Sequence, residues 1–363
     1  MKSDWYETTL GTCVRFQNGK KRPVEGGVIP VYGGNGVLDH TNRSNNRNCV
    51  IIGRVGAYCG SVFREKGICW VSDNAISATV KSDVDIDYIY YFLKNAGLNR
   101  RHIGTSQPLL TQEILNSISI YLPSLPTQKK IAAILSALDE KIAINRAIND
   151  NLQQQAFSVF DNLIANAENN DRTVSDYAFL NPKRTLAKNQ VARSIDMSQL
   201  STSGAFPSGW EIKPFNGGMR FTNGDTLLAR ITPCLENGKT AFIDFLDDGE
   251  VAFGSTEYIV LAPKNDTPPE MLYCLARYPA FVDYAVKNMN GSSGRQRVSA
   301  ETVGQYRLPL FDKHSLVLFR EVVSPMFLKM RYNSLENMRL AELQDALLPK
   351  LMSGEIDVSA VQL

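Results

Sequence analysis

The sequence predicts an α+β protein built from two similar halves, each an α/β lobe followed by a long helix. Three observations predict this fold class. Residues 127–163 lack Gly and Pro and place apolar residues in a heptad pattern. The same pattern returns 188 positions later, and the strand and loop motifs that precede it also recur in order. Because the pattern recurs, the chain is a duplication, and two long helices that share one pattern can close a pseudo-twofold coiled-coil pair.

Polar residues interrupt the apolar seam of each predicted helix at matching places. Asn145 and Asn149 fall in the first seam, and Asn333 and Asn337 fall in the second. Because polar seam residues cost stability and fix register, we expect these asparagines to meet across the pair. Pro325 should kink the second helix or displace its start. The central seam positions are Leu138, Ile142, Asn145, Asn149, Leu152, Met326, Met330, Asn333, Asn337 and Leu340.

The first lobe, residues 1–126, reads as short strands joined by Gly- and Asn-rich loops. The central helix follows at residues 127–165. We expect strands at 28–32, 49–56, 68–71 and 76–80 and a helix at 86–94.

The second lobe, residues 166–312, repeats that order, and residues 313–363 form the C-terminal helix and tail. Strand-like residues at 226–230 and 254–261 precede a predicted helix at 271–278. Residues 165–172 read as a short linker. The Gly-Ser loop at 291–297 matches the Gly-Thr-Ser loop at 104–108, and this match aligns Gln107 with Gln296 as equivalent positions.

Composition is that of a globular protein, with 44% hydrophobic and 21% charged residues. No apolar run is long enough for a membrane span and no signal peptide begins the chain, so we expect a cytoplasmic protein. Six cysteines without a CxxC pair and three scattered histidines favour reduced thiols over a metal site. The first lobe has 14 Lys and Arg against 10 Asp and Glu, and the second has 15 against 17. A nucleic-acid partner must therefore be met by local basic clusters.

Catalytic patterns are missing from the sequence. The Glu-Asn-Gly-Lys-Thr run at 236–240 resembles the end of a P-loop, but Pro233 stands where the first Gly is required. Asp139, Glu140 and Lys141 resemble part of a nuclease motif, yet we expect them on a solvated helix face. We expect no catalytic residue, metal or cofactor in this chain.

Binding chemistry is better represented, because small loop residues let a backbone approach a polyanion while Arg and Gln reach phosphates and base edges. Arg54 and Arg230 each follow a buried strand, where the alternative is an ion pair with a carboxylate such as Glu257. The candidate DNA-binding residues are Lys20, Lys21, Arg22, Tyr32, Asn35, Arg54, Tyr58, Arg100, Arg101, Ser106, Gln107, Arg230, Ser292, Ser293, Arg295, Gln296 and Arg297.

Nearly the whole chain resembles the specificity subunit of type I restriction-modification systems. The resemblance rests on the run at 122–132 leading into Leu138 to Ile142, and on the ending at 347–356. It implies two target recognition domains that each read one half of a bipartite double-stranded DNA site. It also implies an antiparallel pair of long coiled-coil helices that holds the two lobes apart and docks two methyltransferase subunits, with restriction and translocase subunits joining them. S-adenosylmethionine, ATP and Mg would be bound by those partners.

Two other functions stay open at the level of sequence. One is a DNA-modifying enzyme with an unrecognised site in the lobes, and the other is a DNA-independent coiled-coil scaffold.

Helices of about 36 residues are roughly 54 Å long, which suits two half-sites with an unread spacer.

Overall fold

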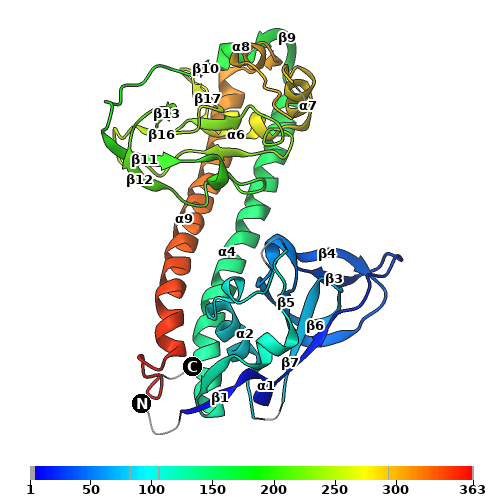
Figure 1. Ribbon diagram of the computed structural model, residues 1–363. Helices are drawn as coiled ribbons and strands as arrows, with labels where there is room; N and C mark the ends of the chain where they lie inside the picture. Colours follow the sequence, from blue (N-terminus) through cyan, green and yellow to red (C-terminus); the bar gives the residue numbers. More distant parts are fainter. Residues whose placement is uncertain (1–4, 82, 105–106, 293, 362–363) are drawn as a thin grey trace. The chain divides into compact units, whose positions relative to one another are not determined.

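The computed structural model describes residues 5–81, 83–104, 107–292 and 294–361 (Figure 1). The chain forms two compact units, residues 1–140 with 341–363 and residues 141–340. Two long helices, α4 (Leu125–Ala165) and α9 (Lys313–Met352), contribute to both units. We call residues 5–122 lobe 1 and residues 168–310 lobe 2. The predicted α+β class with two long helices is confirmed.

Lobe 1 is built on a six-stranded sheet in the order β2-β7-β5-β6-β3-β4. Its central strand β5 is fully buried at Val50, Ile51 and Ile52, and this apolar run explains its position. A separate antiparallel pair joins β1 to β8 just before α4. The elements are β1 (Tyr6–Thr9), α1 (Leu10–Cys13), β2 (Val14–Asn18), β3 (Ile29–Gly33), β4 (Gly36–Thr41), β5 (Asn46–Gly53), η1 (Gly56–Tyr58), β6 (Val62–Val71), β7 (Ala75–Val80), α2 (Ile86–Asn95), η2 (Leu98–Arg100), α3 (Gln112–Asn116) and β8 (Ser119–Leu122).

Lobe 2 has two four-stranded sheets, ordered β10-β17-β14-β15 and β12-β11-β16-β13. The pair β9 and β18 precedes α9 as β1 and β8 precede α4. The elements are β9 (Glu168–Thr173), α5 (Val174–Tyr177), β10 (Ala178–Leu180), β11 (Val191–Ile195), η3 (Met197–Gln199), β12 (Glu211–Pro214), β13 (Met219–Phe221), β14 (Thr226–Ala229), β15 (Thr240–Phe242), β16 (Ala252–Gly254), β17 (Tyr258–Pro263), α6 (Pro269–Arg277), α7 (Pro279–Lys287), α8 (Ala300–Gly304) and β18 (Arg307–Leu310).

The two lobes share one antiparallel core. The strand order β2-β7-β5-β6 in lobe 1 corresponds to β10-β17-β14-β15 in lobe 2. The attachments differ, because lobe 1 extends this sheet through β3 and β4 whereas lobe 2 builds its second sheet. The duplication seen in the sequence is therefore a repeat of topology with different additions.

The ends of two elements differ from the prediction. Helix α4 begins at Leu125, because Pro126 fits the first turn, where its missing N–H is not needed. Helix α9 begins at Lys313 and continues through Pro325, so its start is not displaced. The stretch read as a linker holds β9, because its backbone pairs with β18. Within the described ranges, neither long helix nor any shorter one has an apolar stretch that could cross a bilayer.

The long helices complete the core of each unit. In the first unit Ile131 and Leu135 of α4 pack with Leu351 of α9 on lobe 1 residues. In the second unit Phe160 of α4 and Phe327 of α9 pack on lobe 2. Each lobe is thus fixed to the helix segments of its own unit. All six cysteines are free thiols, five of them buried.

Candidate nucleic-acid interface

Arg54 is held by its backbone at the end of β5. Its N–H donates to the carbonyl of Asn74, 2.9 Å away, in the turn between β6 and β7. Its carbonyl accepts from the N–H of Leu110 at 2.9 Å. The strand end therefore lies between a turn and a loop, which fixes where the arginine side chain starts.

Arg230 has the same two bonds at the end of β14. Its N–H donates to the carbonyl of Glu257 at 3.0 Å, and its carbonyl accepts from the N–H of Val298 at 3.0 Å. The two arginines are thus equivalent positions of the repeat, as the sequence comparison suggested.

Both arginine side chains are half-buried. In each, Nε is buried and has no hydrogen-bond partner among the described residues. A guanidinium stays charged in proteins, and a buried donor without an acceptor costs free energy. Glu257 takes its side-chain hydrogen bonds from Arg297, and the charge of Arg230 also helps to lower the pKa of the Glu257 carboxyl. Arg230 and Glu257 thus interact through their charges without a side-chain hydrogen bond.

A short hairpin loop lies beside each arginine. In lobe 1 the N–H and carbonyl of Ile103 and Leu109 exchange two bonds of 2.9 Å. In lobe 2 Asn290 and Arg297 exchange two bonds of 2.9 Å. Each loop therefore projects from a closed two-residue ladder.

The two loops align one residue away from the sequence prediction. The carbonyl of Pro108 accepts from the N–H of Gly56 at 3.1 Å, and the carbonyl of Gln296 accepts from that of Thr232 at 3.1 Å. Gln296 is thus equivalent to Pro108, and Gln107 is equivalent to Arg295. The predicted pairing of Gln107 with Gln296 is wrong, because the second loop is longer and sequence alone does not show where its ladder closes.

The loop side chains are mostly open to solvent. Gln107, Ser292 and Arg295 are exposed, and Gln296 is half-buried. The N–H of Arg295 donates to the carbonyl of Ser292 at 2.9 Å, which leaves the guanidinium at the loop surface. Ser106 and Ser293 lie outside the described residues.

Arg297 is an internal ion-pair residue. Its Nε lies 3.0 and 2.9 Å from the two carboxylate oxygens of Glu257, and its Nη2 lies 2.8 Å from Oε1. The hydrogen bonds from Arg297 hold the pKa of Glu257 below its usual range. The structure therefore gives Arg297 a role in holding the loop base, where the sequence suggested a DNA contact.

Tyr32 also differs from its predicted role. Its ring is buried beside Phe63, and its hydroxyl donates to Oε2 of Glu65 at 3.0 Å. Burial and that bond raise the pKa of the hydroxyl. The side chain packs in a small core with Cys49, Ile51 and Val71, so it is not open to a ligand in this conformation.

The remaining candidates of lobe 1 lie on its surface. Arg22 forms an ion pair with Asp39, and Nε of Arg101 donates to the carbonyl of Ala96 at 3.0 Å. Tyr58 is 53% exposed beside the end of β5. The exposed members of this set are Lys20, Lys21, Arg22, Asn35, Tyr58, Arg100 and Arg101.

In the second unit, the structure brings the seam asparagines together in two pairs. Nδ2 of Asn145 donates to Oδ1 of Asn337 at 2.9 Å, and Nδ2 of Asn333 donates to Oδ1 of Asn149 at 2.8 Å. Residue numbers increase along α4 while the numbers of their partners decrease along α9, so the two segments run antiparallel. Ile142 and Met330 are buried there, while Leu152 and Met326 pack at the edge of the lobe 2 core. Leu138 and Leu340 are half-buried in their own units.

Asp139 is not on a solvated helix face. Its carboxylate accepts from the hydroxyl of Tyr91 at 2.6 Å and from Nε2 of Gln344 at 2.9 Å. These bonds tie α2, α4 and α9 together within the first unit. Glu140 and Lys141 are exposed as predicted, and the prediction is wrong for Asp139 because the heptad pattern does not show where lobe 1 covers the helix.

Comparison with known proteins supplies the last observation on this site. Residues 2–154 match the family model described as "Type I restriction modification DNA specificity domain". The type I restriction enzyme EcoprrI specificity subunit of Escherichia coli is 31% identical over 140 residues, which cover 36% of this chain. That match spans 35% of the relative's length. The HindI specificity subunit of Haemophilus influenzae is 23% identical, and the match covers 69% of this chain and 71% of the relative.

A solved structure shares the fold. It is the S subunit of a type I restriction-modification system from M. genitalium, with a TM-score of 0.62 and 18% identity. The alignment covers 97% of this chain and 98% of that one. At this identity the likeness concerns the fold alone.

Proposed function

We propose that this chain is the DNA-reading, non-catalytic subunit of a type I restriction-modification complex, because residues 2–154 match the model of the DNA specificity domain and the similar proteins are specificity subunits. Each lobe reads one half of a bipartite double-stranded site. The helices α4 and α9 dock two methyltransferase subunits, and restriction and translocase subunits join that assembly in the cytoplasm. S-adenosylmethionine, ATP and Mg are bound by those partners.

The observation that carries this proposal is the repeated arginine and loop. Arg54 and Arg230 start from equivalent backbone positions, and each side chain is half-buried, so part of it stays at the surface. Phosphate oxygens and base edges accept hydrogen bonds from arginine guanidinium groups. The neighbouring loops present Gln107 in one lobe and Arg295 in the other. One frame with different side chains suits two different half-sites.

The charge distribution argues for weak, salt-sensitive binding by the chain alone. Lobe 2 has more acidic than basic residues, so phosphate attraction rests on a few arginines. Tight DNA binding then requires partner subunits, which supply further contacts.

Genome-wide N6-methyladenine sequencing tests this function. The cognate methyltransferase subunit is expressed with and without this chain. A two-part motif with an unread spacer should appear only when the chain is present. Exchanging residues 1–122 for those of a relative with another target should change one half of the motif and leave the other. Identical methylation in both samples, despite a demonstrated complex, would overturn the proposal in favour of a scaffold.

A further inference from the structure

In the first unit the C-terminal tail covers a groove between the long helices. After α9 the tail turns back, and Val358 is only 2% exposed within the unit's core. Nζ of Lys130 donates to the carbonyl of Ser359 at 2.8 Å, and Ile134 and Leu347 pack on the same core. The last turns of α9 and the first turns of α4 are thus closed over by the chain itself.

In the second unit the equivalent groove has no such cover. The 188-residue offset relates Lys130 to Leu318 and Ile134 to Val322, and it relates Val159 to Leu347. After α4 the chain enters β9 at Glu168, so no segment corresponds to the tail. Leu318 and Val322 are each 47% exposed, whereas Lys130 and Ile134 are half-buried.

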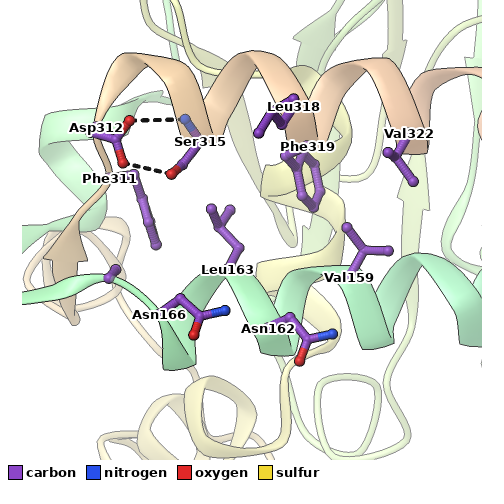
Figure 2. Close-up of a pocket in the computed structure, with 11 residues that line it drawn as sticks. Val159, Asn162, Leu163, Asn166, Phe311, Asp312, Ser315, Leu318, Phe319 and Val322 are labelled. Atoms are coloured by element: carbon purple, nitrogen blue, oxygen red, sulfur yellow. Dashed lines mark hydrogen bonds between the residues drawn. The ribbon is translucent and has the colours of Figure 1, made fainter.

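A pocket of about 250 Å³ lies at this place. Figure 2 shows Leu318, Phe319 and Val322 of α9 facing Val159 and Leu163 of α4. Exposed apolar side chains gathered around a concave surface are typical of interaction sites. The full lining is Val159, Asn162, Leu163, Asn166, Ala167, Phe311, Asp312, Ser315, Leu318, Phe319 and Val322.

The chemistry of the lining indicates what the groove accepts. The offset places Asn162 where the first unit has Lys350, and Leu318 where it has Lys130, so both cations of the tail-covered groove are absent here. Asp312 caps α9 by accepting from the N–H of Ser315 at 2.9 Å and from its hydroxyl at 2.5 Å. The pocket floor is aliphatic and aromatic, and its rim has the amides of Asn162 and Asn166, with the Asp312 carboxylate at one end bonded to Ser315. It therefore fits an extended aliphatic segment without charge at its centre.

We propose that this groove binds an extended aliphatic segment of a methyltransferase subunit, in the manner in which the tail occupies the groove of the first unit. The identity of the partner rests on the proposed function. The chemistry of the segment rests on the two grooves alone. The tail of a second copy is a weaker occupant, because the apolar residues Ile356, Val358 and Val361 of each tail already pack on its own chain.

Peptide binding to the full-length chain tests the groove. The probe is a fluorescein-labelled peptide with the sequence of residues 353–363 carrying Glu355→Gln and Asp357→Asn. Fluorescence anisotropy should give saturable binding, weakened at least tenfold by Leu318→Asp or Val322→Asp. Val317→Asp is the matched control, because Val317 is 45% exposed on the same helix and does not line the pocket. No binding, or binding unchanged by Leu318→Asp but lost in Ile134→Asp, would overturn the site.

A second measurement tests the partner. Leu318→Asp should weaken capture of the purified cognate methyltransferase subunit at least tenfold, while Val317→Asp should not. Any residual methylation should keep the same DNA motif, because the lobes are unchanged. Full capture by Leu318→Asp would overturn this inference and leave the DNA-reading function intact. A self-association of the parent chain that Leu318→Asp abolishes would assign the groove to a second copy and overturn the methyltransferase partner.

Discussion

Lobe 1 and lobe 2 keep the same backbone frame and differ in what is attached to it. Both hold an arginine at the end of a core strand by two main-chain bonds, beside a hairpin loop closed by a two-residue ladder. They differ in the outer strands, in loop length and in net charge. The backbone bonds therefore fix where the arginine and the loop lie, while a few side chains determine which groups meet a ligand. A protein that reads two unlike half-sites needs that separation.

Replacing the two equivalent arginines should have the largest effect on DNA affinity, because both lobes depend on them. Arg54→Ala and Arg230→Ala should each weaken binding of the assembled complex to its DNA site by about 5- to 150-fold, as expected for the loss of one good arginine contact. Fluorescence anisotropy on labelled duplex measures this. Arg331→Ala is the control, since Arg331 is not a candidate and its Nη1 is already bonded to the carbonyl and carboxylate of Asp244. An Arg54→Ala complex that melts and binds like the parent would contradict the role given to this position.

Exchanging the side chains at the equivalent loop position should have a smaller effect, which appears in the salt dependence of DNA binding. Gln107 and Arg295 are equivalent and differ by one positive charge. Gln107→Arg should steepen the plot of log Kobs against log salt by about one unit, and Arg295→Gln should flatten it by about one. Equilibrium titrations of the complex at several salt concentrations give both slopes. Slopes that do not move in opposite directions would show that this loop position does not meet phosphate.

Much of the frame could be predicted from sequence because it depends on periodicity. The heptad seam predicted both long helices, and its polar exceptions predicted that the seam asparagines meet, although which asparagine bonds to which came only from the structure. Apolar runs predicted the central strands, including β5. These features follow from the spacing of residue types, which local sequence shows directly.

The details of the site depended on long-range contacts that no local pattern reports. Tyr32 ends a predicted strand, but no local pattern shows that its ring packs in a small core and that its hydroxyl bonds to Glu65 of another strand. Arg297 looked like a free cation, although Glu257, from a segment 40 residues away, neutralises it. The loop alignment was wrong by one residue because the ladder between Asn290 and Arg297 sets it. The buried, unpartnered Nε atoms of the two strand-end arginines had no sequence signal.

The smallest predicted effect concerns the ion pair at the base of the lobe 2 loop. Lobe 1 has no such pair, because Leu109 stands where lobe 2 has Arg297. The pKa of Glu257 is lowered in the folded protein by the hydrogen bonds from Arg297. A lowered folded pKa adds stability that is complete above the ordinary glutamate pKa of about 4.3 and is lost as pH falls through the folded value. Hydrogen exchange of the Arg297 amide should therefore lose protection by about two- to fivefold on acidification, a modest change because the pair is partly exposed. In Glu257→Gln that acid-dependent loss should vanish, and the Leu109 amide of lobe 1 should show none in either protein. Equal acid sensitivity at both ladders would mean that the loop bases open for a reason common to the two lobes, and the ion pair would then have no part in holding the second one closed.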